Sequence, residues 1–182
     1  MARKIEETVT VPQGIEATLD GHILSVKGKL GTLQRMVGNP LVTIKEENNT
    51  ITLSTSSSLR KQKRMLYTIK SHINNMIQGV QNPYQYKLKI CSGHFPITIK
   101  VEGQYVTISN FLGEKIPRKS KVLPNVTVKI DKDAILVQSF DLEAAGQTAA
   151  NLEQATRVGS VTAASSKMVV ISLKNQDGIS YE

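Results

Sequence analysis

The sequence predicts an α+β protein built from two tandem, duplicated small domains, each an antiparallel sheet with one packed helix. Three observations predict it: an internal repeat, short segments in which apolar and polar residues alternate, and an amphipathic helical segment late in each repeat. The segment Leu19 to Val26 aligns with Val101 to Ile108, 82 residues later in the chain. In both copies a Leu-Gly pair follows, Leu30-Gly31 and Leu112-Gly113. Two copies of one folding unit, without a catalytic signature, favour a binding protein over an enzyme.

The expected domains are residues 1–82 and 83–182, and their strands show as alternating apolar residues between turn formers. Asn48-Asn49 and Asp131-Lys132-Asp133 are the expected hairpin turns. The expected strands contain Ile23/Val26, Val42/Ile44 and Ile51/Leu53 in the first half, and Val101/Tyr105/Val106/Ile108, Val126/Val128/Ile130 and Ile135/Val137 in the second.

A helix is expected after the strands of each half. Ser56-Ser57-Ser58 is the expected cap of the first helix and Asp141 that of the second. The residues expected on the buried stripes are Leu59, Leu66, Ile69, Ile73 and Ile77 in the first helix, and Leu142, Ala145, Ala149 and Leu152 in the second.

The chain is strongly basic, with a formal charge of +8 and a pI near 9.6 over 182 residues. Lys and Arg outnumber Asp and Glu in both halves, so no acidic tail offsets the charge. This balance suggests a polyanionic partner, and ordinary solubility is the alternative explanation.

Several function classes are disfavoured. No segment resembles a signal peptide or a membrane span, so we expect no membrane partner and a location in the cytosol or nucleus. The single cysteine, Cys91, excludes an internal disulfide and is expected in a buried strand. His22, His72 and His94 lack metal-ligand spacing, and no nucleophile motif accompanies them. We expect no enzymatic activity, cofactor, metal or small-molecule substrate.

The start of the first helix is crowded with cations, Arg60, Lys61, Lys63 and Arg64. Positive charge at a helix N-terminus opposes the macrodipole, so the cluster is expected to have an anionic partner. A solvated basic face is the alternative. Arg60, Lys63 and Arg64 are candidate RNA ligands.

The most specific string, Asn110 to Lys121, holds four cations around a Gly and a Pro: Lys115, Arg118, Lys119 and Lys121. The equivalent loop of the first half offers Lys27 and Lys29. Neither loop has the order of a nucleotide-hydrolase phosphate loop, but both can bring cations and backbone to phosphates. Arg118 is expected to contribute more than Lys115, because a guanidinium can bind a phosphate with two hydrogen bonds. Replacing both residues by alanine is not expected to affect melting.

The second helix exposes an uncharged ridge of amides, Gln147, Asn151 and Gln154. Amides can donate to phosphates and accept from ribose hydroxyls, so the ridge is a candidate RNA contact, with chance composition as the alternative. His94 has two interpretations as well. It donates to a phosphate, or it only turns the chain while Phe95 and Pro96 close the core.

Several long strings occur in the order in which one known family has them: VKGKLGTL, SHINNMIQGV followed by YKLKI, HFPI, NFLGEKIPR, GQTAANLEQATRV and DGISYE. The chain resembles the universal sixth protein of the large ribosomal subunit, in the branch shared by archaea and eukaryotes. The resemblance covers most of the chain, and that family's fold of two duplicated α+β domains agrees with the repeat.

The resemblance implies a structural, RNA-binding protein of the large subunit, near the sarcin-ricin loop and the base of the factor-recruiting stalk. The implied partners are large-subunit rRNA and neighbouring ribosomal proteins, and the implied location is the cytoplasmic ribosome, with nucleolar assembly in a eukaryote. It also implies that the second domain and the C-terminal end hold the RNA, which adds Arg157, Asp177 and Gly178 as candidates. An RNA-binding adaptor acting off the ribosome is the competing hypothesis.

The resemblance fails between residues 159 and 174, where the family has a short basic segment. Met168 to Leu173 predicts a strand, and the Ser/Ala stretch before it predicts a linker.

Overall fold

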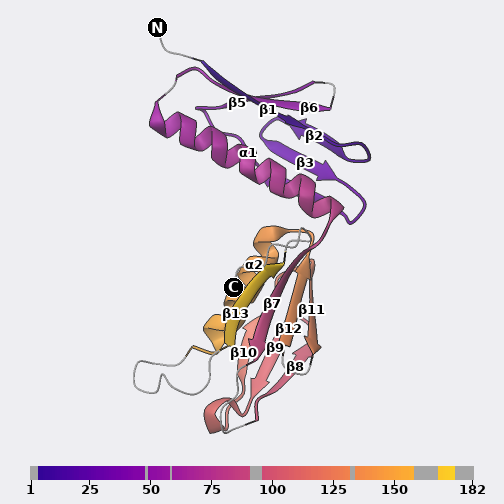
Figure 1. Ribbon diagram of the computed structural model, residues 1–182, viewed down its shortest axis with the longest axis vertical. Helices are drawn as coiled ribbons and strands as arrows, with labels where there is room; N and C mark the ends of the chain where they lie inside the picture. Colours follow the sequence, from indigo (N-terminus) through magenta and orange to yellow (C-terminus); the bar gives the residue numbers. More distant parts are fainter. Residues whose placement is uncertain are drawn as a thin grey trace. The chain divides into compact units, whose positions relative to one another are not determined.

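The computed structural model describes residues 4–47, 49–57, 59–90, 96–131 and 134–157, and the backbone of 168–174. The chain divides into two compact units, unit 1 (Met1–Pro83) and unit 2 (Tyr84–Glu182) (Figure 1). Each unit has its own hydrophobic core.

Unit 1 consists of two three-stranded antiparallel sheets and one long helix. The sheet orders are β1-β6-β5 and β2-β3-β4, and α1 packs against strands of both sheets (Figure 1). The elements are β1 (Ile5–Thr10), β2 (Glu16–Asp20), β3 (Ile23–Lys27), β4 (Thr32–Met36), β5 (Thr43–Glu47), β6 (Thr50–Thr55) and α1 (Arg60–Gln81).

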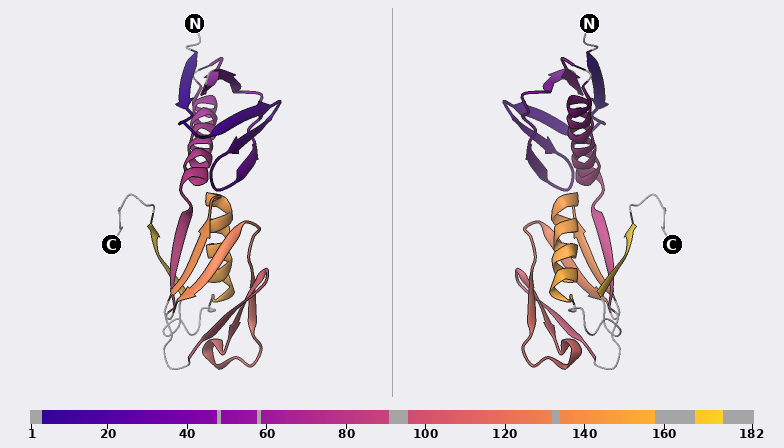
Figure 2. Two further views of the ribbon diagram at one scale, coloured as in Figure 1. Left: turned by 90° about the vertical axis from the view of Figure 1, so that its right-hand side faces the viewer. Right: turned by 90° about the vertical axis from the view of Figure 1, so that its left-hand side faces the viewer.

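Unit 2 repeats this plan and adds a strand. Its sheets have the orders β11-β12-β7-β13 and β10-β9-β8, and α2 packs against both (Figure 2). The elements are β7 (Tyr84–Ile90), β8 (Thr98–Glu102), β9 (Tyr105–Ser109), the short 3₁₀ helix η1 (Phe111–Gly113), β10 (Arg118–Lys121), β11 (Val126–Asp131), β12 (Ala134–Ser139), α2 (Leu142–Ala155) and β13 (Met168–Lys174).

The predicted fold class and duplication are confirmed by the strand connections. The order β7-β12-β11 matches β1-β6-β5, and the meander β8-β9-β10 matches β2-β3-β4. Leu30-Gly31 and Leu112-Gly113 both lie in the connection from the second to the third strand of their meander. The sequence predicted one sheet per domain, whereas each unit divides its strands between two sheets that share a helix.

The period-two patterns become buried strand faces. Ile51 and Leu53 on β6 are fully buried, as are Ile135 and Val137 at the matching positions of β12. β6 is the middle strand of its three-stranded sheet and β12 is an inner strand of its four-stranded sheet, so each pairs with neighbours on both sides. Val, Ile and Leu thus supply most of both cores.

The helical stripes are confirmed with one exception in each helix. Leu66, Ile69, Ile73 and Ile77 are buried, but Leu59 is 65% exposed. Leu59 precedes the first turn of α1 as its N-cap, with extended backbone, so the helical spacing does not apply to it. In α2 the first stripe residue, Leu142, is only half-buried, and the other three are buried.

The predicted serine cap of α1 is wrong. Leu59 is the N-cap, and it makes no side-chain capping bond, while Thr55 Oγ1 instead donates to Gln62 Oε1 at 2.9 Å. The Asp141 cap of α2 is confirmed, because its carboxylate accepts from the Glu143 amide at 2.9 Å.

The predicted strand near the end of the chain is confirmed as β13, which pairs antiparallel with β7. The predicted linker before it, and Cys91, Phe95, Asn48, Ser58, Lys132 and Asp133, lie outside the described residues.

Candidate nucleic-acid interface

The loop between β3 and β4 is held against the end of α1. The Leu30 amide donates to the Val80 carbonyl at 3.3 Å, and the Gly28 amide donates to the Gly31 carbonyl at 3.0 Å. A Cβ on Gly28 would lie 2.7 Å from a Val80 methyl carbon, so only glycine fits this approach. The loop is therefore a fixed platform rather than a loose connection.

Two candidate RNA ligands, Lys27 at the end of β3 and Lys29 in the loop, lie here. Lys29 is exposed, and Lys27 is exposed beside Glu16, with Nζ 3.5 Å from Oε2 across the β2–β3 pair. An exposed pair of this kind contributes little to stability, so Lys27 can exchange the carboxylate for a phosphate at small cost.

The cation cluster at the start of α1 is brought together as predicted. Arg60, Lys61, Lys63 and Arg64 are all exposed, and the first turn holds no acidic residue. Lys63 lies over the Tyr67 ring, 5.9 Å from its centre.

Behind this cluster, a carboxylate of β1 binds a more distant part of α1. Glu7 Oε2 accepts from Lys70 Nζ at 2.6 Å, and Glu7 Oε1 accepts from the Tyr67 hydroxyl at 3.2 Å. The Lys70 hydrogen bond is the main reason that the pKa of Glu7 is lowered, and the charge of Lys63 adds to it. Lys63 therefore lies near a carboxylate, which makes it a weaker candidate RNA ligand than the other cations of the cluster.

In unit 2 the loop before β10 is organised by Arg118, and this role differs from the predicted one. The guanidinium donates two hydrogen bonds to the Glu114 carboxylate, from Nε to Oε2 at 2.8 Å and from Nη2 to Oε1 at 2.5 Å. It lies over the Phe111 ring at 4.4 Å. Nη1 donates to the carbonyls of Ala155 at 2.9 Å and Arg157 at 3.2 Å, where α2 ends.

Arg118 is thus a clamp between η1, β10 and the C-terminus of α2. Most of its donors are used within the protein, and a cation at a helix C-terminus is favoured by the macrodipole. The hydrogen bond from Arg118 also lowers the pKa of the Glu114 carboxyl and so stabilises its charged form. The sequence missed this role because it shows the spacing of Glu114 and Arg118 but not the return of α2 to the same place.

The other cations of the string are exposed. Lys115 lies in the loop itself, and Lys119 and Lys121 flank the buried Ser120 on β10. Strand alternation puts Lys119 and Lys121 on one face of the sheet and Arg118 on the other. Lys119 and Lys121 can therefore address one surface together, and Arg118 cannot join them there.

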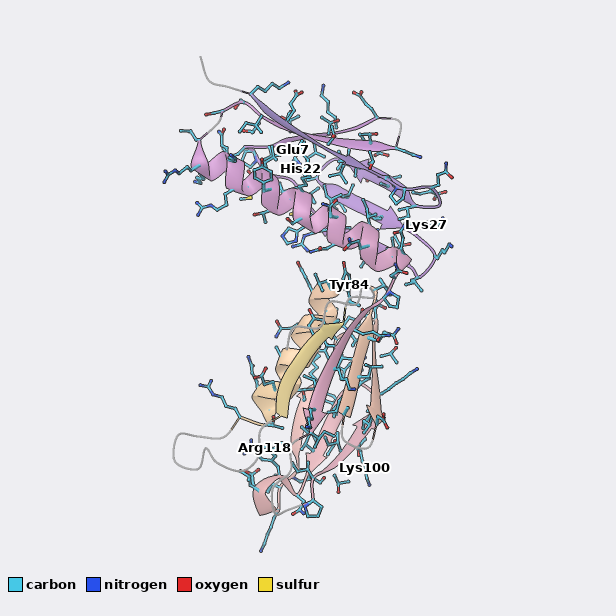
Figure 3. All side chains as sticks on the ribbon, viewed as in Figure 1. Glu7, His22, Lys27, Tyr84, Lys100 and Arg118 are labelled. Atoms are coloured by element: carbon cyan, nitrogen blue, oxygen red, sulfur yellow. The ribbon has the colours of Figure 1, made fainter. Side chains whose placement is uncertain are left out.

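Strand register adds residues that the sequence did not single out. Lys100, Thr107 and Lys119 form one cross-strand row of the sheet β10-β9-β8, and Glu102, Tyr105 and Lys121 form the next. We call the outward side of these two rows the lysine face. Figure 3 labels Lys100 and Arg118, which the strand register places on opposite faces of this sheet. The sequence could have revealed the lysine face if the outward-facing alternate positions of all three strands had been aligned with one another.

The amide ridge of α2 is partly used within the unit. Gln147 Nε2 donates to Asn151 Oδ1 at 2.9 Å, and Asn151 Nδ2 donates to the Lys121 carbonyl at 3.2 Å. Asn151 thereby ties α2 to β10 and helps to fix the strand that carries Lys119 and Lys121. Gln154 and Arg157 are exposed at the end of the helix.

The candidates His94, Asp177 and Gly178 lie outside the described residues. In the part of the chain that is described, no cluster of three or more His, Cys, Asp or Glu side chains has the proximity that a metal ion needs. No helix among the same residues is both long and apolar enough to cross a bilayer.

Comparison with known proteins agrees with this arrangement. The family model described as "Ribosomal protein L6" matches residues 11–82 and 95–171, one segment in each unit. The protein "Large ribosomal subunit protein uL6" of Methanospirillum hungatei is 42% identical over 154 residues, which cover 85% of this chain and 88% of that protein. Its namesakes in Methanothrix thermoacetophila (39% over 158 residues, 87% and 90% covered) and Nanoarchaeum equitans (40% over 159 residues, 84% and 83% covered) are similarly close. The chain therefore belongs to the ribosomal protein L6 family, a family of structural ribosomal proteins and not of enzymes.

Proposed function

We propose that this chain is a structural constituent of the large ribosomal subunit and binds large-subunit rRNA. The observation that carries the proposal is the family match, which extends over both units and most of the chain. The chemistry of the surface supports it, because exposed lysines and arginines gather in three places on a protein of net charge +8. Phosphate contacts of this kind supply most of the affinity of such proteins.

We further propose the position of the protein in the particle. The resemblance of its sequence strings favours a place near the sarcin-ricin loop and the base of the factor-recruiting stalk, in contact with neighbouring large-subunit proteins. In the cell the protein then resides on cytoplasmic ribosomes, with nucleolar assembly if the source is a eukaryote.

The residues proposed to touch RNA fall into groups by position. Arg118 is better described as the residue that shapes its loop, and the candidates outside the described residues stay predictions. The groups are Lys27 and Lys29 beside the end of α1, Arg60, Lys63 and Arg64 at its start, Lys115, Lys119 and Lys121 around β10, Gln147, Asn151, Gln154 and Arg157 on and after α2, and His94, Asp177 and Gly178.

Sedimentation tests the proposal. A tagged copy of the full chain is expressed in cells, and large subunits are purified through a high-salt sucrose cushion. We expect one copy per large subunit and none on free small subunits. A protein that washes off in high salt is an adaptor, which would refute the proposal. Hydroxyl-radical footprinting of the purified subunits then locates the protected rRNA, and protection far from the sarcin-ricin region would contradict the proposed position.

A further inference from the structure

The lysine face combines an exposed aromatic ring with surrounding cations. Tyr105 is 48% exposed on the middle strand and pairs directly with Glu102 and Lys121. In the next row Lys100 and Lys119 stand on either side of Thr107, two strand spacings or about 10 Å apart. Thr107 itself is only 8% exposed, so the longer side chains around it form the surface.

The duplication shows that the fold does not require these residues. In unit 1 the two matching rows are Thr18, Ser25 and Gln34, followed by Asp20, Ile23 and Met36. In unit 1 these two rows thus contain no lysine and no aromatic residue, and they contain one carboxylate, Asp20. Unit 2 carries three lysines and a tyrosine where a solvent-facing sheet needs neither, which points to a ligand of that face.

We propose that the lysine face binds unpaired RNA, with one base stacked on Tyr105 and the flanking phosphates on Lys100, Lys119 and Lys121. This inference rests on the proposed role as an rRNA-binding protein and names the kind of RNA element that this face takes. Every base has a π-face, so an exposed ring beside a positive surface is a stacking platform for single strands. A duplex cannot use it, because its bases are already stacked.

Glu102 favours RNA over an acidic peptide as the occupant. Its carboxylate accepts from the Thr107 hydroxyl at 3.0 Å and lies in the row of Tyr105. A nucleotide whose base stacks on the ring presents base amino groups or its ribose hydroxyl as donors, and a carboxylate oxygen can accept from them. An acidic peptide offers mostly carboxylates, which Glu102 repels.

Base stacking on Tyr105 is tested with the full-length chain and a short oligouridylate that carries one 2-aminopurine. Stacking of this base on Tyr105 is expected to quench its fluorescence. Tyr105→Ala should weaken binding by at least about fivefold and abolish the quenching, whereas Tyr105→Phe keeps both. Ile23→Ala, at the matching position of unit 1, should change neither. A blunt-ended RNA duplex should bind the wild type and Tyr105→Ala equally well.

The lysines are tested through the salt dependence of the same complex. Lys100→Thr with Lys119→Gln gives unit 2 the residues found at the matching positions of unit 1. We expect the slope of log K against log salt to shrink by about 1.4, or about 0.7 for each lost phosphate contact. Lys45→Thr with Lys129→Gln removes the same charge from exposed positions outside the face and should leave the slope as in the wild type.

The outcomes separate this inference from the proposed function. If the wild type co-sediments with large subunits but oligouridylate binds equally to all variants, or not at all, the lysine face is not an RNA site and only this inference fails. If poly-glutamate instead loses affinity in the lysine variant, the face is a protein contact, and the inference is again overturned. Melting curves identify a variant that fails to fold, in which case the Tyr105→Phe result and the lysine slope decide.

Discussion

Arg118 shows how one side chain joins three elements that are distant in sequence. Its guanidinium binds Glu114 in the loop, covers Phe111, and donates to two carbonyls at the end of α2. Charge-assisted hydrogen bonds are stronger than neutral ones, and a planar fork can serve several acceptors at once. The residue that looked most like an RNA ligand in the sequence is therefore a support for the residues around it.

Substituting Arg118 is expected to destabilise the protein. Arg118→Ala removes the grip on Glu114 and leaves the carbonyls of Ala155 and Arg157 without this donor, so the free energy of unfolding should fall by about 2 kcal/mol. Urea unfolding of the full chain measures it. Lys115→Ala removes the same charge from an exposed position in the same loop and serves as the control. Equal stability of the two variants would show that the clamp contributes nothing.

The same ion pair predicts a pH dependence. Because Arg118 lowers the pKa of Glu114, its stabilising contribution is complete above the ordinary glutamate value of 4.5 and is lost as the pH falls through the lowered pKa. Glu114→Gln should therefore reduce the loss of stability on acidification, measured by urea unfolding between mildly acidic and strongly acidic buffers. In the Arg118→Ala background the same substitution should have no such effect. An unchanged acid response in both backgrounds would exclude the linkage.

At the scale of elements, the contact between the β3–β4 loop and α1 sets the position of Lys27 and Lys29. The contact depends on the missing side chain of Gly28, whose place is taken by Val80.

Gly28→Ala should push the loop away from the helix. Because the new Cβ would lie within 2.8 Å of two Val80 side-chain atoms, we expect a loss of about 1–3 kcal/mol in the free energy of unfolding. Thermal melting measures the change, and Lys29→Ala in the same loop is the control. A melting temperature equal to that of the wild type would mean that the loop adapts without cost.

The elements themselves were largely predictable, and the failures have physical reasons. Alternation located strands such as β6 and β12, in which one face is buried, and the helical stripe located α1 from Leu66 onward. The strands β1 and β4 were not among those expected. The serine cap failed because α1 begins at Arg60 with Leu59 as its N-cap, so the serines precede the cap position. The division into two sheets could not be predicted, since alternation shows which residues face inward but not which strands pair.

At the scale of the whole molecule, the repeat was visible in the sequence because matching turns and strands kept their spacing. The candidate site was predicted less well. The cation clusters are brought together, but the clamp by Arg118 and the bond from Asn151 to β10 depend on contacts between distant segments. The lysine face was missed for the same reason, since its members come from three strands that only the register aligns.

The two halves are expected to act as separate domains with different roles. We predict that residues 83–182, without residues 1–82, fold and keep most of the affinity for an rRNA fragment from the factor-binding region, because the longest family strings lie there. Circular dichroism and a binding titration against the full chain test this. A folded second half that no longer binds would assign the specific contacts to unit 1 or to both units together.

The strand order of each unit also fixes the order in which it can form during synthesis. The meander β2-β3-β4 pairs only neighbours in sequence and is complete at Met36, whereas β1 pairs with β6, so Ile5 lies opposite Thr55. Local pairings form fast and distant ones late. While this protein is being translated, its first strand must therefore wait unpaired until residue 55 has left the exit tunnel, and β7 must wait in the same way for β12.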